Sequence, residues 1–154
     1  MKKPIKLSYK KLPHFKPLPN DVEPFSKATV TDAGFDLYAA EEKMVPGHST
    51  VKVKTGLAIA GMPSDIFGKI WDRSSVATDS PFSILAGVVD PDYTGELIVV
   101  VHNRKLDPWK VYKGQKIAQI TFLPLPQINF TELSEQDSMP ETARGDKGFG
   151  SSGE

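Results

Sequence analysis

The chain has 154 residues, no cysteine, and 19 basic residues balanced by 19 acidic ones, so its formal net charge is zero. These values predict one domain with a single core, and they exclude a disulfide framework, a thiolate metal site and a broad basic surface for nucleic acid or an anionic membrane. No apolar run approaches the roughly 20 residues of a membrane-spanning helix, and no apolar segment follows the Lys-rich start, so we expect a cytoplasmic or nuclear protein, not a secreted one.

The first half of the chain predicts a surface excursion followed by strands. Four prolines in residues 13–24 indicate an extended surface segment. Residues 33–40 are expected to form a short strand in which Asp36 stands between apolar neighbours. Residues 50–60 alternate apolar and polar side chains, which is the period of a strand that buries one face.

The second half predicts further strands at residues 66–71, 96–102 and 116–123, separated by turns rich in Pro, Gly and Asp. Residues 103–113 are expected to form a loop. Helical periodicity is nearly absent, so the pattern is typical of an all-β sandwich or barrel. We expect one β domain over residues 1–134 and a flexible C-terminal arm over residues 135–154.

An arginine and two serines, Arg73, Ser74 and Ser75, follow the strand that ends at Trp71. This combination at a strand end can bind phosphate through side chains and backbone amides together. A solvent-exposed turn with a surface ion pair between Asp72 and Arg73 would have the same sequence, so both interpretations stay open.

Asp90 stands where a short apolar strand enters a tight turn, and Tyr93 follows three residues later. A carboxylate there can take a proton from water as a general base, and the aromatic ring can pack on a sugar. A turn capped by its own carboxylate is the structural alternative. Gln119, in the strand at 116–123, has the donor and the acceptor needed to orient a water molecule.

The glycine-rich end of the chain, residues 144–153, has residue types that suit a nucleotide. Glycines let backbone N–H groups approach phosphate oxygens, Arg144 can hold a phosphate through two parallel hydrogen bonds, and Phe149 offers a face to a base. A flexible tail is the alternative. The sequence contains no Walker A, serine-hydrolase or zinc-protease motif. Mg²⁺ held by substrate oxygens and water would need no protein cage.

Taken together and in this order, the five segments resemble the five motifs of the trimeric deoxyuridine triphosphatase (dUTPase) family. The resemblance covers about residues 31–153. It implies a jelly-roll-like β fold, Mg²⁺ as cofactor, and a homotrimer whose sites combine motifs from several subunits. It also implies hydrolysis of dUTP to dUMP and pyrophosphate, which lowers dUTP and supplies dUMP for thymidylate synthesis. Neither nucleic acid nor a membrane is an implied partner.

The resemblance also implies residue roles. Asp36 would act on the metal through water, Asp90 would activate the attacking water, and Gln119 would help to hold that water. Tyr93 would pack against the deoxyribose and exclude a 2′-hydroxyl. The implied substrate-binding positions are Arg73, Ser74, Ser75, Gly87, Val88, Tyr93, Ile98, Arg144, Phe149, Gly150, Ser151 and Ser152. Within this set, main-chain groups around Gly87, Val88 and Ile98 would read uracil.

Three positions carry departures from the family pattern or additions to it. Ser75 stands where a glycine is common, Asp72 where a proline or alanine is frequent, and Lys147 adds a cation to the last motif. Two alternative functions stay open. A deoxycytidine triphosphate deaminase resembles the same fold, but it uses a glutamate where this chain has Val100. A non-catalytic, nucleotide-sensing binding module is the second alternative.

Overall fold

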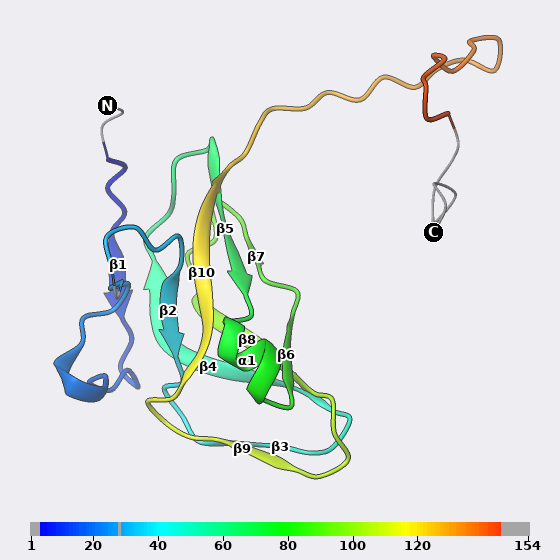
Figure 1. The fold of residues 1–154 in the computed structure, drawn as a ribbon. Helices are drawn as coiled ribbons and strands as arrows, with labels where there is room; N and C mark the ends of the chain where they lie inside the picture. Colours follow the sequence, from blue (N-terminus) through cyan, green and yellow to red (C-terminus); the bar gives the residue numbers. More distant parts are fainter. Residues whose placement is uncertain (1–3, 28, 146–154) are drawn as a thin grey trace.

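The computed structural model describes residues 4–27 and 29–145, and most of its regular structure is β (Figure 1). One sheet has the strand order β1 (Tyr9–Lys11), β4 (Thr50–Ile59), β8 (Glu96–Asn103) and β6 (Phe82–Leu85). A second has the order β2 (Phe35–Tyr38), β10 (Lys116–Pro124), β5 (Ile66–Trp71) and β7 (Val88–Val89). A separate ribbon pairs β3 (Lys43–Val45) with β9 (Trp109–Val111). All these pairings are antiparallel.

The hydrophobic core lies between the two four-stranded sheets. In β8, the side chains of Leu97, Val99 and Val101 are fully buried and alternate with half-buried neighbours, as expected for a strand with one inward face. They share one cluster with Leu37 of β2 and Ile120 of β10, which belong to the other sheet. The prediction of an all-β, jelly-roll-like sandwich is therefore confirmed.

The longer strands lie where the sequence predicts them. The patterns at residues 50–60, 66–71, 96–102 and 116–123 correspond to β4, β5, β8 and β10, with ends that differ by at most one residue. These strands carry enough residues for the period of two to be visible. Their pairing positions the residues discussed below.

Three shorter elements differ from the sequence predictions. A helix, α1 (Ser74–Asp79), occupies the segment expected to be a turn after β5. The expected loop at residues 103–113 contains β9. The expected extended segment at residues 13–24 contains a 3-10 helix, η1 (Pro19–Asp21), and buries Leu18. Elements of three to six residues are too short to show a periodic pattern in the sequence. Contacts with partners elsewhere in the fold stabilise them instead.

After β10 the chain leaves the sandwich. Residues 125–145 contain no helix or strand, and Figure 1 shows them running away from the β body, coloured from yellow to red. The proposed domain boundary at residue 134 stays a prediction. Within the part of the chain that the structure describes, no helix is both long and apolar enough to cross a membrane.

Candidate functional site

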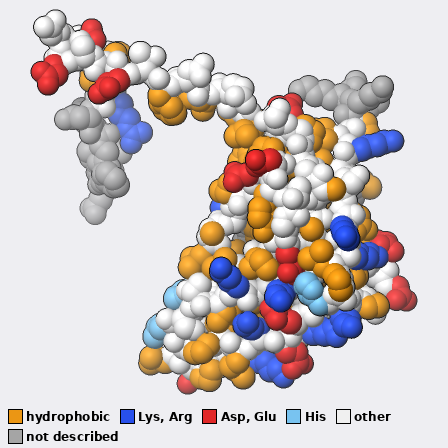
Figure 2. All heavy atoms as spheres, turned by 180° about the vertical axis from the view of Figure 1, so that it is seen from behind, with side chains coloured by type: hydrophobic (Ala, Val, Ile, Leu, Met, Phe, Trp, Pro, Cys, Tyr) orange, Lys and Arg blue, Asp and Glu red, His pale blue; other side chains and the backbone are white. Residues whose placement is uncertain are grey.

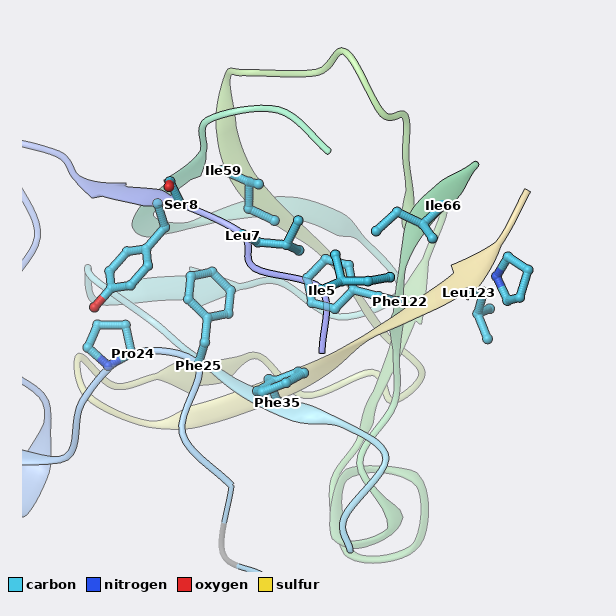
Figure 3. A pocket seen from close by; sticks show the side chains of 12 residues that line it. Ile5, Leu7, Ser8, Pro24, Phe25, Phe35, Ile59, Ile66, Phe122 and Leu123 are labelled. Carbon is cyan, nitrogen blue, oxygen red and sulfur yellow. The ribbon is translucent and has the colours of Figure 1, made fainter. Parts of the chain in front are cut away.

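An apolar pocket of about 510 Å³ lies beside β1, β5 and β10. Figure 3 shows the rings of Phe25, Phe35 and Phe122 gathered around it with the side chain of Ile66. The ring centroids of Phe35 and Phe122 are 5.8 Å apart in an edge-to-face arrangement. The described residues that line this pocket include no Asp, Glu, Lys, Arg or His. It therefore lacks the charged groups that a phosphate-bearing ligand requires.

A second pocket, of about 270 Å³, brings three of the predicted segments together. Gln119 of β10 pairs with Asp36 of β2 on one side and with Trp71 of β5 on the other. Paired residues of adjacent strands project to the same face of a sheet. Arg73 and Ser74 follow directly after β5 and line the same pocket as Asp36 and Gln119. Strand register alone thus joins segments that lie far apart in the sequence.

The centre of this pocket is a carboxylate between two cations. The Nε of Arg73 donates a hydrogen bond to Oδ1 of Asp36 at 2.8 Å, and the Nζ of Lys116 lies 2.8 Å from Oδ2. The Asp36 side chain is 20% exposed. The hydrogen bond to Asp36 is the main cause that raises the pKa of Lys116 above its usual 10.5, so this lysine stays charged at neutral pH.

Gln119 has a fixed orientation in the same pocket. Its Nε2 donates to the backbone oxygen of Asp72 at 2.9 Å. Asp72 in turn accepts, through Oδ1, the backbone N–H of Ile84, within β6, at 2.7 Å. Gly34 leaves the space for this arrangement, since a Cβ on it would lie 3.2 Å from the Cβ of Gln119 and closer still to its amide. The Asp72 side chain thus makes a backbone contact that a proline or alanine could not make.

A third pocket, of about 180 Å³, contains the predicted residues of the hairpin after β7. It is lined by Gly87, Val88, Asp90, Tyr93 and Ile98, together with Glu96 and apolar side chains of β5 and β8. Asp90 and Tyr93 thus line one pocket, and the roles given to them stay predictions.

The position of Tyr93 is set by backbone contacts. Its backbone N–H donates to the oxygen of Asp90 at 3.1 Å, and its hydroxyl donates to the oxygen of Glu96 at 2.9 Å. Gly87 has a φ of +93°, and a Cβ there would lie 2.6 Å from the backbone oxygen of Ile70. Only glycine fits this close approach without strain.

Two strand edges beside the third pocket have no partner strand among the described residues. The pairing of β6 with β8 ends at Leu85 and Val100, so Ile98 has no partner strand on that side among the described residues. On the other side of the pocket, β7 with Val88 is the edge strand of its sheet. Edge positions carry backbone donors and acceptors that are free to bind other groups.

Sequence reasoning missed four charged residues of these pockets. The second pocket is also lined by Lys27, Asp32 and Lys116, and the third by Glu96. Oε1 of Glu96 lies 2.8 Å from Nε2 of His14 and accepts the backbone N–H of Gly56 at 2.8 Å. Strict alternation would place Lys116 and Gln119, three residues apart, on opposite faces of β10. The register shift between Lys116 and Ala118 in the pairing with β2 brings both side chains into the same pocket, and the sequence does not show this shift. Nothing in the sequence connects Glu96 to His14, 82 residues away.

The two charged pockets share no lining residue, so the chain does not bring all predicted site residues together. Asp36, Arg73, Ser74 and Gln119 line one pocket, whereas the residues around Asp90 line the other. Ser75 belongs to α1 and lines neither. Arg144 lies on the arm, which extends away from the body (Figure 1). The predicted residues Phe149, Gly150, Ser151 and Ser152 lie outside the described part of the chain.

The side chains of the second pocket fit a Mg²⁺ ion that arrives with the substrate better than a metal ion held by the protein alone. Among the described residues, no group of three or more His, Cys, Asp or Glu side chains could hold a metal ion. Both oxygens of Asp36 already contact cations. Mg²⁺ usually keeps several waters and takes its other ligands from substrate phosphates, so contact with Asp36 through water suits this pocket.

The face of the β body that Figure 2 shows carries charges of both signs, with Lys and Arg side chains interspersed among Asp and Glu. Ion pairs also occur among the described residues away from the pockets, such as Lys110 with Glu42, whose Nζ and Oε2 are 2.7 Å apart.

The fold and the pockets define a small antiparallel β-sandwich with an ionic pocket, which is the second pocket with Asp36 and Arg73, and a hairpin pocket, which is the third pocket with Asp90 and Tyr93. A family model described as dUTPase matches residues 20–153, and the chain belongs to the dUTPase family.

Known members of this family resemble the chain over most of its length. The deoxyuridine 5′-triphosphate nucleotidohydrolase of Wolbachia pipientis subsp. Culex pipiens is 37% identical over 153 residues, which cover 97% of this chain and 96% of that protein. The enzyme of the same name from Yaba monkey tumor virus is 37% identical over 128 residues, covering 83% and 87%. Among solved structures, the dUTPase of Staphylococcus bacteriophage 80alpha with dUPNHPP aligns with a TM-score of 0.80 and 26% identity, over 96% of this chain and 98% of that chain.

Proposed function

We propose that this chain hydrolyses dUTP to dUMP and pyrophosphate, and thereby lowers dUTP and supplies dUMP for thymidylate synthesis. The observation that carries the proposal is the grouping of family-motif residues into one ionic and one aromatic pocket. Membership of the dUTPase family supports the choice of substrate.

The hairpin pocket is the candidate nucleoside site. The ring of Tyr93, held over Gly95 and bonded to the oxygen of Glu96, would pack against the deoxyribose and leave no room for a 2′-hydroxyl. Main-chain groups around Gly87, Val88 and Ile98 would pair with uracil. A base that left one of these buried groups unpaired would bind about 1–3 kcal/mol less tightly, which supports discrimination against cytosine.

The ionic pocket is the candidate phosphate site. Arg73 and Ser74 would bind the phosphate chain, with Ser75 adjacent on α1 and Lys116 adding a second cation. Guanidinium groups bind phosphate oxygens through paired, charge-assisted hydrogen bonds. When bound, Mg²⁺ would offset charge on the triphosphate, and Asp36 would contact it through water.

The chemical step needs one water, one base and one leaving group. Asp90 would take a proton from the attacking water, whose oxygen forms the new bond to the α-phosphorus as the bond to the bridging oxygen of pyrophosphate breaks. Gln119 would hold that water through the end of its amide that is not bonded to Asp72.

A homotrimer would unite these parts, because Asp90 and Gln119 line different pockets of one chain. The ionic pocket of one copy would face the hairpin pocket of a second copy, and the arm with Arg144 and Phe149 would close over both. The separation of the pockets and the course of the arm in Figure 1 support this arrangement.

The test is pyrophosphate release with Mg²⁺ from dUTP, dCTP, dTTP and UTP in parallel, with ammonia release followed for dCTP. We expect selective cleavage of dUTP. Asp90→Asn should keep nucleotide binding nearly intact and lose most turnover, since it removes the base and keeps the shape. Cleavage of UTP as fast as dUTP would contradict the role of Tyr93.

Deamination of dCTP is the second candidate that this assay resolves. Val100 lines the hairpin pocket where the deaminase family has a glutamate. Glu96 is the carboxylate nearest in sequence, and its Oε1 is occupied by His14 and the N–H of Gly56. These contacts favour hydrolysis over deamination. Ammonia from dCTP would contradict this choice.

A further inference from the structure

Arg104, just after β8, binds the backbone at the end of α1. Its Nη2 donates to the oxygens of Ser80 at 2.8 Å and Ala77 at 3.2 Å, and its Nε donates to the oxygen of Pro81 at 3.4 Å. Its own backbone N–H also donates to Pro81, at 2.8 Å. The last carbonyls of a helix have no partner within the helix, so an arginine in this position satisfies them.

The helix α1 depends on such contacts because it is short. A helix of six residues is not stable by itself, and Val76 is its one buried side chain among the described residues. At its other end, the carboxylate of Asp72 accepts the N–H of Ile84, and the oxygen of Asp72 accepts the amide of Gln119. The helix is therefore fixed at both ends and rests on one apolar side chain.

The residues at the start of α1 are those assigned to phosphate binding. Arg73 precedes the helix, and Ser74 and Ser75 form its first turn. Movement at the far end of so short a helix would tilt this first turn away from the ionic pocket. A misplacement of about 1 Å in a positioning contact can lower a rate by up to about 100-fold.

We propose that Arg104 is a positioning residue for residues 73–75, so that it supports triphosphate binding without touching the substrate. This inference rests on the proposed function. Arg104 lines neither charged pocket, and its contacts reach the active segment only through the backbone of α1.

The chain offers a matched control and a conservative variant. Lys105 carries the same charge one position later, and its side chain makes no hydrogen bond or ion pair with the described residues. A lysine at position 104 would place one ammonium where the guanidinium reaches three carbonyls through a fixed fork. Arg104→Lys should therefore restore only part of what Arg104→Ala removes.

The experiment compares Arg104→Ala, Arg104→Lys and Lys105→Ala in the full chain. Hydrogen exchange of the α1 amides is measured without nucleotide, and kcat and KM are measured with dUTP and Mg²⁺. Inhibition by deoxyuridine, which has no phosphate, reports on the hairpin pocket. For Arg104→Ala we expect exchange in α1 about tenfold faster and kcat/KM about tenfold lower, since charge-assisted hydrogen bonds are lost. For Arg104→Lys, the exchange rate and kcat/KM should lie between those of the unaltered chain and of Arg104→Ala. Lys105→Ala should change neither quantity by more than about twofold.

Deoxyuridine inhibition decides between positioning and general damage. We expect it to stay unchanged in Arg104→Ala, because a local tilt of α1 leaves the hairpin pocket intact. Equal weakening of deoxyuridine and dUTP would overturn the inference, as would unchanged exchange in α1 or unchanged kinetics with dUTP. If the unaltered chain does not cleave dUTP, the proposed function fails and this inference fails with it. If the unaltered chain cleaves dUTP and Arg104→Ala matches it, the proposed function stands and only the positioning role of Arg104 is wrong.

Discussion

Replacing Asp36 by asparagine tests the ion pairs at the centre of the ionic pocket. The carboxylate contacts Arg73 and Lys116 at 2.8 Å each, and the side-chain exposures are 20%, 28% and 41% for Asp36, Arg73 and Lys116. A hydrogen bond to a charged group contributes about 1.5–3 kcal/mol when well buried, and solvent screening at these exposures reduces that value. Asn retains one oxygen for Arg73 but turns a donor toward Lys116. We therefore expect the free energy of unfolding to fall by about 2 kcal/mol.

The assay is urea unfolding of the ligand-free protein at one protein concentration, because self-association would make stability concentration-dependent. Asp65→Asn is the matched control, since Asp65 is exposed and its side chain makes no hydrogen bond or ion pair with the described residues. It should change stability by less than about 0.5 kcal/mol. The difference between the two variants should shrink in about 1 M salt, which screens exposed charges. If Asp36→Asn unfolds like Asp65→Asn, the ion pairs do not stabilise the fold as argued.

Three further predictions follow from particular contacts. Gly87→Ala should lower the free energy of unfolding by at least about 1–2 kcal/mol, because it combines a positive φ with a Cβ 2.6 Å from the oxygen of Ile70; unchanged urea unfolding would contradict the close approach. The hydrogen bond to Asp36 raises the pKa of Lys116 in the folded state. The ion pair of this lysine therefore stabilises the fold fully below the ordinary pKa of lysine, and this stabilisation is lost as pH rises through the raised pKa of the folded state. The stability difference between the unaltered chain and Lys116→Gln should therefore stay constant from about pH 7 to about pH 9, and a decline within that range would refute this sign. Deleting residues 144–154 should lower turnover of dUTP much more than the unfolding midpoint, and equal losses would indicate a structural role for the arm.

The sequence predicts this fold best where strands are long. In β8, Leu97, Val99 and Val101 alternate with half-buried residues over eight positions, so the period of two is visible without any knowledge of partners. Helix α1 has no such signal, because its six residues are fixed by Asp72 and Arg104, which lie outside it. Propensity is a weak guide when tertiary contacts of this kind decide the local structure.

For the site too, the sequence shows which residues are candidates but not which tertiary contacts they make. The residues around Asp36, Asp90 and Gln119 could be selected by type and order, and two pockets contain them. The residue pattern does not show their division between two pockets, because it depends on register: Gln119 pairs with Asp36 and Trp71, and none of these pairs with β7 or β8. Only the family resemblance implied that motifs of different subunits combine. The contribution of Lys116 was missed because one lysine in a strand resembles any solvent-facing cation.

Complementation between two inactive variants tests most directly whether the chain is a dUTPase whose site is shared between copies. Asp90→Asn lacks the proposed base, and deletion of residues 144–154 removes the arm. The two variants are unfolded and refolded together, and dUTP cleavage is compared with that of each variant refolded alone. We predict that the mixture regains a substantial fraction of activity, because some mixed trimers hold an intact Asp90 from one copy and an intact arm from another. If the mixture stays as inactive as its components while the unaltered chain refolds to full activity, the site is complete within one chain and the shared arrangement is wrong.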